Sequence, residues 1–105
     1  MATKQEFNSF EDMLASSDIP VLVDFYATWC GPCQIMAKIL EQVNAQMSGQ
    51  LKIVKIDTDK YEQLAVDNRV YALPTLVLFK KGQPVDRIEG VMQPADLIQR
   101  LQSFL

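Results

Sequence analysis

The chain has no histidine, only two cysteines and a single tryptophan among its 105 residues. A structural zinc site commonly takes four cysteine or histidine ligands, so the two cysteines alone do not supply one. Internal repeats, linkers and low-complexity segments are also missing, and with 49% hydrophobic and 22% charged residues the composition is that of a folded globular protein. We therefore expect a single domain over residues 1–105, without a metal site and by default monomeric.

The chain is also poor in positive charge and in long apolar runs. Its formal net charge is −3 and its lysines are spread thinly, unlike the basic stripe of proteins that bind nucleic acid. The longest apolar run, 19–27, is interrupted by Asp24 and is too short to span a bilayer. The N-terminal residues contain no apolar signal-peptide region, and because the chain begins at Met1 we expect no removed targeting segment. These features predict no nucleic-acid partner, no membrane partner and a reducing, cytoplasmic location.

The spacing of apolar residues predicts alternating strands and helices. Glycine and proline mark several boundaries: Gly49 follows the second helix, Gly82 lies in a tight turn, and Pro94 begins the last helix. A further weak strand is expected at 3–7. The chain should therefore form an α/β protein with a central mixed β-sheet flanked by helices on both faces. The predicted strands are 20–27, 51–57, 75–80 and 84–90, and the predicted helices are 8–16, 35–47, 61–68 and 94–105.

Both cysteines lie within four residues, between a buried strand and a long helix. Pro32 suits the first helical turn, where a backbone N–H is not needed, so Cys30 is expected at the helix N-terminus. The free N–H groups and the dipole at that end favour a thiolate. Cys33, three residues further on, returns to the same side of the helix within reach of Cys30. The pattern predicts a redox-active pair with a lowered pKa at the first cysteine.

Three other interpretations of the pair are weaker. A disulfide between residues three apart closes a very small loop and would stabilise the fold little. Two inert buried thiols would leave their spacing unexplained. The cysteines could also be incidental to a binding module whose apolar surface docks a partner, and a double cysteine-to-serine variant would distinguish that case.

The residues around the cysteines carry a family resemblance. The motif "WCGPC" and the stretches "VDFYATWCGPC", "VKIDTD", "ALPTLVLFKKG" and "IEG" resemble those of thioredoxins in order and spacing. The details "YATWCGPCQ", "DRIEG" and "LIQRL" are most similar to the y-type thioredoxins of plastids and cyanobacteria. The resemblance implies a thioredoxin fold and a protein-disulfide reductase that cycles between dithiol and disulfide forms. It implies no cofactor beyond the Cys30–Cys33 disulfide, and it favours reduction over an oxidase or isomerase activity because Gly31 and Pro32 separate the cysteines.

Asp24 is an acidic residue within an apolar strand. A buried carboxylate without a partner is costly, so it should be protonated or paired, unless it lies at a strand end facing water. The resemblance implies that Asp24 is buried beneath Cys33, exchanges a proton with that thiol and is tuned by Lys55. Taken alone, Lys55 would be read as a solvated surface residue.

The resemblance also implies a surface that binds target proteins. The residue preceding a cis Pro74, Leu73, would pair its backbone with an extended target segment. By the same likeness Gly90 belongs to a third contact loop, although alone it could be an ordinary turn glycine. The residues expected to bind the target are Trp29, Leu73, Pro74, Thr75, Gly90 and Val91.

Three positions depart from the usual thioredoxin pattern. Tyr26 replaces a frequent tryptophan and Gln34 a frequent basic residue, which bears on partner preference. Lys38 replaces a frequent helix-kinking proline, which puts the kink of that helix in doubt. By resemblance, the electron donor is a ferredoxin- or NADPH-dependent thioredoxin reductase, and the targets are disulfide proteins such as peroxiredoxins or methionine sulfoxide reductases. A plastid stroma-like compartment would suit the same resemblance.

Overall fold

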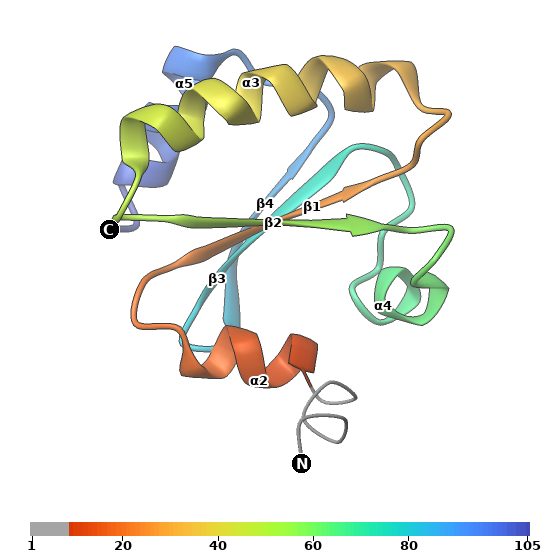
Figure 1. Ribbon diagram of the computed structural model, residues 1–105, viewed down its shortest axis with the longest axis horizontal. Coiled ribbons are helices and arrows are strands. Elements are labelled where there is room, and N and C mark those ends of the chain that lie inside the picture. The colour runs from red at the N-terminus through yellow and green to blue at the C-terminus, as the bar shows by residue number, and fades with distance from the viewer. Residues whose placement is uncertain (1–8) are drawn as a thin grey trace.

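The computed structural model describes residues 9–105, and the strand expected at 3–7 lies outside them. The remaining predicted strands and helices are all present, with boundaries shifted by a few residues (Figure 1). In chain order they are α2 (Ser9–Ser16), β1 (Val21–Tyr26), α3 (Gly31–Met47), β2 (Lys52–Asp57), α4 (Glu62–Asp67), β3 (Thr75–Lys80), β4 (Gln83–Glu89) and α5 (Pro94–Gln102).

The four strands form one mixed sheet in the order β2-β1-β3-β4. Strand β1 pairs in parallel with β2 and antiparallel with β3, and β3 pairs antiparallel with β4. The sequence of β1, VLVDFY, is buried on both faces, as a strand in the middle of a sheet covered on both sides requires. The register places Asp24 beside Lys55 of β2 and Leu76 of β3.

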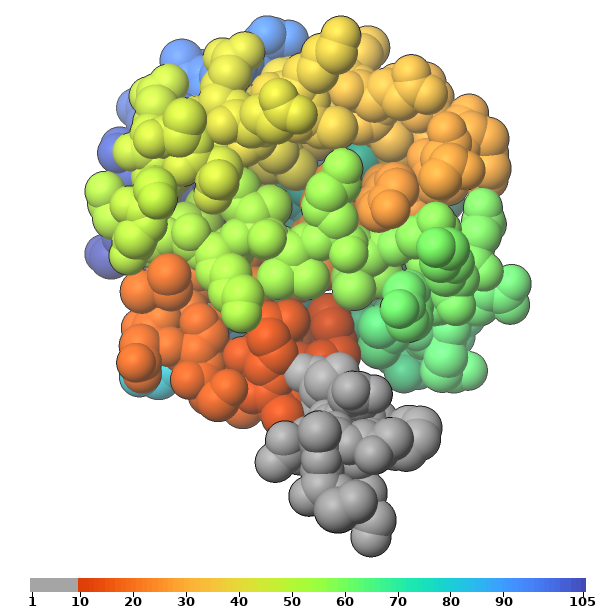
Figure 2. All heavy atoms as spheres, in the orientation of Figure 1, coloured from red at the N-terminus to blue at the C-terminus, as the bar shows by residue number. Residues whose placement is uncertain are grey.

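Helices cover both faces of the sheet, as the sequence predicted: α3 and α5 lie on one side, and α2 and α4 on the other (Figure 1). The buried core on the α3 side includes Leu22, Met36, Leu40, Leu76 and Leu97. The core on the other side contains Leu14, Val21, Val23, Phe25, Ile56, Val77 and Phe79. Successive residues of β1 therefore alternate between the two cores, in keeping with the period of two along a strand. Figure 2 shows the side chains of edge strand β2 as a band between α3 and α2.

A two-residue turn joins β3 to β4. Lys81 and Gly82 lie between the paired residues Lys80 and Gln83 and have φ values of 51° and 82°. Two successive positive φ angles match the twist of a tight hairpin, which explains the glycine. A Cβ at Gly82 would approach the Cα of Ala15 to 3.3 Å, so the turn also lies directly against α2.

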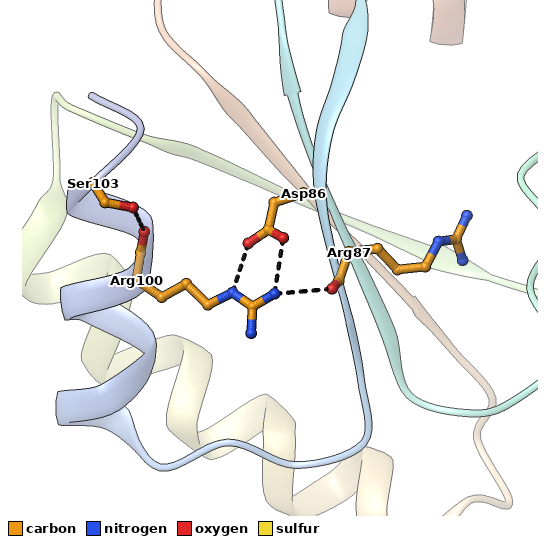
Figure 3. Close-up of polar contacts among 4 residues, drawn as sticks. All are labelled: Asp86, Arg87, Arg100 and Ser103. Atoms are coloured by element: carbon orange, nitrogen blue, oxygen red, sulfur yellow. Dashed lines mark hydrogen bonds and ion pairs between the residues drawn. The ribbon is translucent and has the colours of Figure 1, made fainter.

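The last helix is tied to β4 by an ion pair. Figure 3 shows the Arg100 guanidinium facing the Asp86 carboxylate, to which its Nε and Nη2 donate hydrogen bonds of 2.7 and 2.8 Å. Nη2 also donates to the backbone oxygen of Arg87 at 3.3 Å. This two-pronged contact lowers the pKa of Asp86, chiefly through the hydrogen bonds from Arg100.

Two residues depart from the predicted helix faces. Ile35 was expected on the buried face of α3 but is 55% exposed, because the face that meets the core runs through Cys33, Met36 and Leu40. Leu105 was expected to extend the apolar face of the last helix. Instead α5 ends at Gln102, and Leu105 lies beyond it with 48% of its surface exposed. Helix α3 runs without interruption past Lys38.

No helix in residues 9–105 is both long and apolar enough to cross a bilayer.

Candidate active site

The two cysteines form a disulfide at the start of α3. Cys30 caps the helix in an extended conformation, and its Sγ accepts a hydrogen bond of 3.2 Å from the backbone N–H of Cys33. Pro32 lies in the first turn, as predicted. The Cα atoms of the cysteines are 5.2 Å apart, close to the separation of about 5 Å that a regular α-helix gives residues three apart. The helix itself thus places the two sulfurs together.

Only one of the two cysteines lines a surface groove. Both are buried, with 5% of Cys30 and 3% of Cys33 exposed. Cys30 nevertheless lies in the wall of a groove of about 490 Å³, whose lining does not include Cys33. A partner in the groove therefore meets Cys30 first. The groove is lined by Trp29, Cys30, Gly31, Pro32, Thr58, Val70, Tyr71, Ala72 and Leu73.

Trp29 borders this groove with 71% of its surface exposed. Its indole Nε1 donates a hydrogen bond of 2.9 Å to Oδ2 of Asp59. The backbone N–H of Asp59 in turn donates to Oδ1 of Asp57 at 2.9 Å. This exposure leaves the ring available to a partner, and the carboxylate that holds the ring was not predicted from the sequence. Asp59 lies in the quoted stretch "VKIDTD", but a contact across 30 residues leaves no local pattern.

The opposite wall of the groove is the segment before β3. The Leu73–Pro74 peptide bond is cis, as the resemblance implied. Leu73 is partly buried and lines the groove, whereas Pro74 and Thr75 are buried. The Thr75 hydroxyl donates to the backbone oxygen of Ala72 at 2.6 Å. Pro74 and Thr75 therefore lie beneath this wall and contribute no exposed side chain to it.

Gly90 is connected to the same segment. Its backbone N–H donates to the oxygen of Pro74 at 2.9 Å, and its φ of +88° lies in the region that favours glycine. Val91 follows with 39% of its surface exposed and is not part of the groove lining. The structure thus groups the predicted residues as a groove beside Cys30 and an adjoining loop at 90–91.

Asp24 is 1% exposed, which excludes the alternative of a strand end facing water. It lies on the same face of β1 as Leu22, toward α3, whose first turn carries the cysteines. Neither of its carboxylate oxygens has a hydrogen-bond partner within residues 9–105. Burial raises the pKa of Asp24 to about 6, and the positive charge of Lys55 partly opposes this rise. Near neutral pH the group can therefore accept or release a proton.

Lys55 is adjacent to Asp24 in the register of the parallel strands, but its side chain is exposed. Its ammonium lies 4.9 Å from the centre of the Tyr26 ring, within the range of a cation–π contact. The ring of Tyr26, which replaces the usual tryptophan, therefore contacts the ammonium of the same lysine whose charge lowers the pKa of Asp24.

Residues at both sides of the groove were not predicted from the sequence. Thr58 donates from its hydroxyl to the backbone oxygen of Tyr26 at 3.0 Å and so ties the loop that carries Asp59 to the end of β1. Val70, Tyr71 and Ala72 form the wall next to Leu73, and 84% of Tyr71 is exposed. The position of Tyr71 shortly before the "ALPT" stretch is the only sequence signal that could have indicated it.

A disulfide at the N-terminus of a helix, beside a groove and on the face of the sheet toward which a buried acid points, defines a thiol–disulfide exchange protein. A family model described as Thioredoxin matches residues 1–103. The chain belongs to the thioredoxin family. Members of this family are thiol–disulfide oxidoreductases with a redox-active disulfide, so the chain is a protein-disulfide reductase that uses Cys30 and Cys33. Thioredoxins act on disulfide targets and are reduced by a thioredoxin reductase.

Individual relatives agree with this assignment. The chain is 62% identical over 105 residues, the whole of both chains, to the thioredoxin-like protein slr0233 of Synechocystis sp.. It is 53% identical over 104 residues to the chloroplastic Thioredoxin Y1 of Arabidopsis thaliana, covering 99% of this chain and 60% of that protein. A crystal structure of chloroplastic thioredoxin z superposes with a TM-score of 0.84 at 41% identity, covering 91% of this chain and 87% of the other. The predicted similarity to y-type thioredoxins is confirmed.

Proposed function

We propose that Cys30 is the nucleophile and Cys33 the resolving thiol of this reductase. The observation that supports the assignment is that Cys30 lines the groove while Cys33 lies behind it. The Cys30 thiolate attacks one sulfur of a target disulfide, forms a mixed disulfide and displaces the other target sulfur as a thiolate. The Cys33 thiolate then attacks Cys30, closes the Cys30–Cys33 bond and releases the second target thiol. Two electrons pass to the target, and the protein is left oxidised.

Asp24 is the group that accepts the proton of Cys33 and returns it in the reverse direction. Its pKa of about 6 suits this role, because the carboxylate and the acid are both accessible near neutral pH. Lys55 tunes that pKa through its charge. Gly31 and Pro32 form the first turn of α3, which brings the sulfurs of Cys30 and Cys33 close enough to bond.

An extended segment of the target binds along the groove. Leu73 pairs its backbone with this segment, Pro74 and Thr75 hold Leu73 from beneath, and Trp29 packs against it. Gly90 and Val91 contact its other side. Peroxiredoxins and methionine sulfoxide reductases are the target classes that the resemblance suggests.

The electron donor is a thioredoxin reductase of the ferredoxin- or the NADPH-dependent type. Similarity to a chloroplastic y-type protein supports the ferredoxin-dependent enzyme, and activity assays with each reductase would distinguish the two. We further infer a single monomeric domain that works in the cytoplasm or in a stroma-like reducing compartment, with no nucleic-acid or membrane partner.

A trapping experiment tests the roles of the cysteines. The reduced Cys33→Ser variant should accumulate a mixed disulfide between Cys30 and a disulfide-bearing target, detected by non-reducing electrophoresis and mass spectrometry. The matched Cys30→Ser variant should trap far less, because the remaining thiol lies behind the groove. Equal trapping by both variants would contradict the assignment.

The reduction potential tests the direction of the reaction. Titration against defined thiol–disulfide buffers should give about −270 mV, a value typical of thioredoxins, as expected of a protein that reduces others. A value near about −180 mV would instead support an oxidase or isomerase.

A further inference from the structure

Tyr71 is the most exposed large apolar side chain within residues 9–105, at 84%, compared with 71% for Trp29. It contributes little to the core, yet it lines the same groove as Cys30. A large aromatic ring left in solvent beside a reactive sulfur is characteristic of a binding surface, where aromatic residues supply much of the contact energy.

The backbone on both sides of Tyr71 is held in place. The N–H of Val70 donates to the oxygen of Ala65 at 2.9 Å, and the Arg87 guanidinium donates to the backbone oxygens of Asn68 and Arg69. On the other side, the hydroxyl of Thr75 donates to the oxygen of Ala72. The ring therefore projects from a short segment anchored at each end, and it can meet a target without first ordering a loop.

Tyr71 and Leu73 both line the groove, and an extended partner could contact both of them. A target segment that lies along this wall presents alternate side chains to it, at intervals of about 6.5 Å. When such a segment pairs with the backbone of Leu73, a target side chain close in sequence to the reacting cysteine lies opposite Tyr71.

The lining of the groove indicates the chemistry of that side chain. None of the nine residues that line it is charged. The nearby Asp59 carboxylate accepts a hydrogen bond from Trp29. Aromatic and apolar contacts are therefore the main means of selection along this wall.

We propose that Tyr71 is a specificity-determining residue, which binds an apolar or aromatic side chain near the disulfide cysteine of the target. The inference rests on the proposed function and adds a preference to it. Targets with a large apolar residue within two positions of the cysteine are reduced faster than targets with glycine there.

The test uses two synthetic peptide disulfides that differ only at the residues flanking the cysteine, with phenylalanine in one and glycine in the other. Second-order rate constants are measured with the pre-reduced protein. Wild type should prefer the phenylalanine peptide by roughly tenfold, the size expected for one buried aromatic contact. Tyr71→Ala should reduce this preference to less than about threefold, whereas Tyr71→Phe should retain it.

Tyr61 provides a matched control, because it is an exposed tyrosine (53%) outside the groove. Tyr61→Ala should keep the full preference. A second variant, Tyr71→Gln, should behave like Tyr71→Ala and separates loss of the ring from any effect of alanine on the backbone. If Tyr71→Ala and Tyr71→Gln discriminate between the peptides as wild type does, or if wild type shows no preference, the inference is overturned.

If the proposed function itself is wrong, the experiment gives a different result from a failure of the Tyr71 proposal alone. Wild type would then reduce neither peptide, nor a small aromatic disulfide such as 5,5′-dithiobis(2-nitrobenzoate). Reduction of that small disulfide without discrimination between the peptides would leave the reductase intact and remove only the role of Tyr71.

Discussion

Lys55 Nζ lies 4.9 Å from the centre of the Tyr26 ring, although the strand register places Lys55 directly beside Asp24. The ammonium therefore acts on Asp24 through space, since neither carboxylate oxygen has a hydrogen-bond partner in the described part of the chain. A nearby positive charge can lower the pKa of a buried acid even though it donates no hydrogen bond to the carboxylate oxygens. Asp24 consequently retains a pKa of about 6, above its ordinary value of 3.8.

Replacing Lys55 with methionine should raise the pKa of Asp24 further above about 6, because burial would then act without the opposing charge. The measurement is a carboxyl-resolved NMR titration of the oxidised protein. Lys52→Met is the matched control, because Lys52 is an exposed lysine of the same strand that pairs with Val21. An unchanged titration in Lys55→Met would show that the lysine has no influence on the acid.

Asp24→Asn should stabilise the oxidised protein above pH 6. The folded state holds a proton on Asp24 up to about pH 6, whereas the unfolded chain releases it near 3.8, so this contribution to stability is complete below 3.8 and lost as the pH rises to about 6. At pH 8 the ionised, buried acid costs roughly 3 kcal/mol. The asparagine amide lacks partners too, so the expected net gain is about 1–3 kcal/mol in the free energy of unfolding.

Denaturant titrations between pH 4 and pH 8 test this expectation. The difference between Asp24→Asn and wild type should grow over that range and level off above about pH 6. Asp18→Asn, at an exposed position, should follow the wild-type curve. A difference independent of pH would mean that the substitution acts through packing.

Most of the fold could be predicted because its signals are local. The apolar strand containing Asp24, the glycine of the hairpin turn and Pro32 at the start of α3 each act within a few residues. Ile35 was misplaced because its spacing suits a broad apolar face, but the sheet covers only part of that face.

The site was less accessible to prediction than the fold. The cysteine pair is local in sequence, and its location followed from spacing alone. The cis bond before Pro74 came from family resemblance, since no local pattern demands it. The contact between Trp29 and Asp59 joins residues 30 positions apart. The exposure of Tyr71 depends on how its segment packs against the rest of the protein. A single exposed residue produces no repeating pattern in the sequence from which its exposure could be predicted.

Arg100→Met should lower the free energy of unfolding by about 1 kcal/mol at pH 7, as expected for a bidentate pair that is partly exposed. Since the pKa of Asp86 is depressed, the pair stabilises the protein above pH 3.8 and loses this effect as the pH falls through the lower folded value. A double-mutant cycle with Asp86→Asn, by urea denaturation, isolates the interaction. A coupling energy that stays the same at low pH would contradict the ionic origin of the contact.

Gly90→Ala should both destabilise the protein and slow the reduction of protein targets. A φ of +88° costs alanine about 1 kcal/mol, and the added methyl would project from the loop next to Pro74. Gly49→Ala is the matched control, because Gly49 has a φ of +86° and equally open surroundings but lies beyond the far end of α3. Both variants should lose similar stability in urea titrations. If both also reduce a protein disulfide at the same rate, the 90–91 loop does not contact the target.

The disulfide joins the N-cap of α3 to a residue of its first turn, and their Cα separation of 5.2 Å is close to the one that a regular helix gives residues three apart. Opening the bond therefore requires no movement of the backbone, and the sheet and the helices need not change with the number of electrons held. The oxidised and reduced proteins then present nearly the same surface at a distance from the sulfurs. A reductase or a target can distinguish them only by touching the sulfur itself, so each exchange depends on direct contact and not on a signal carried through the fold.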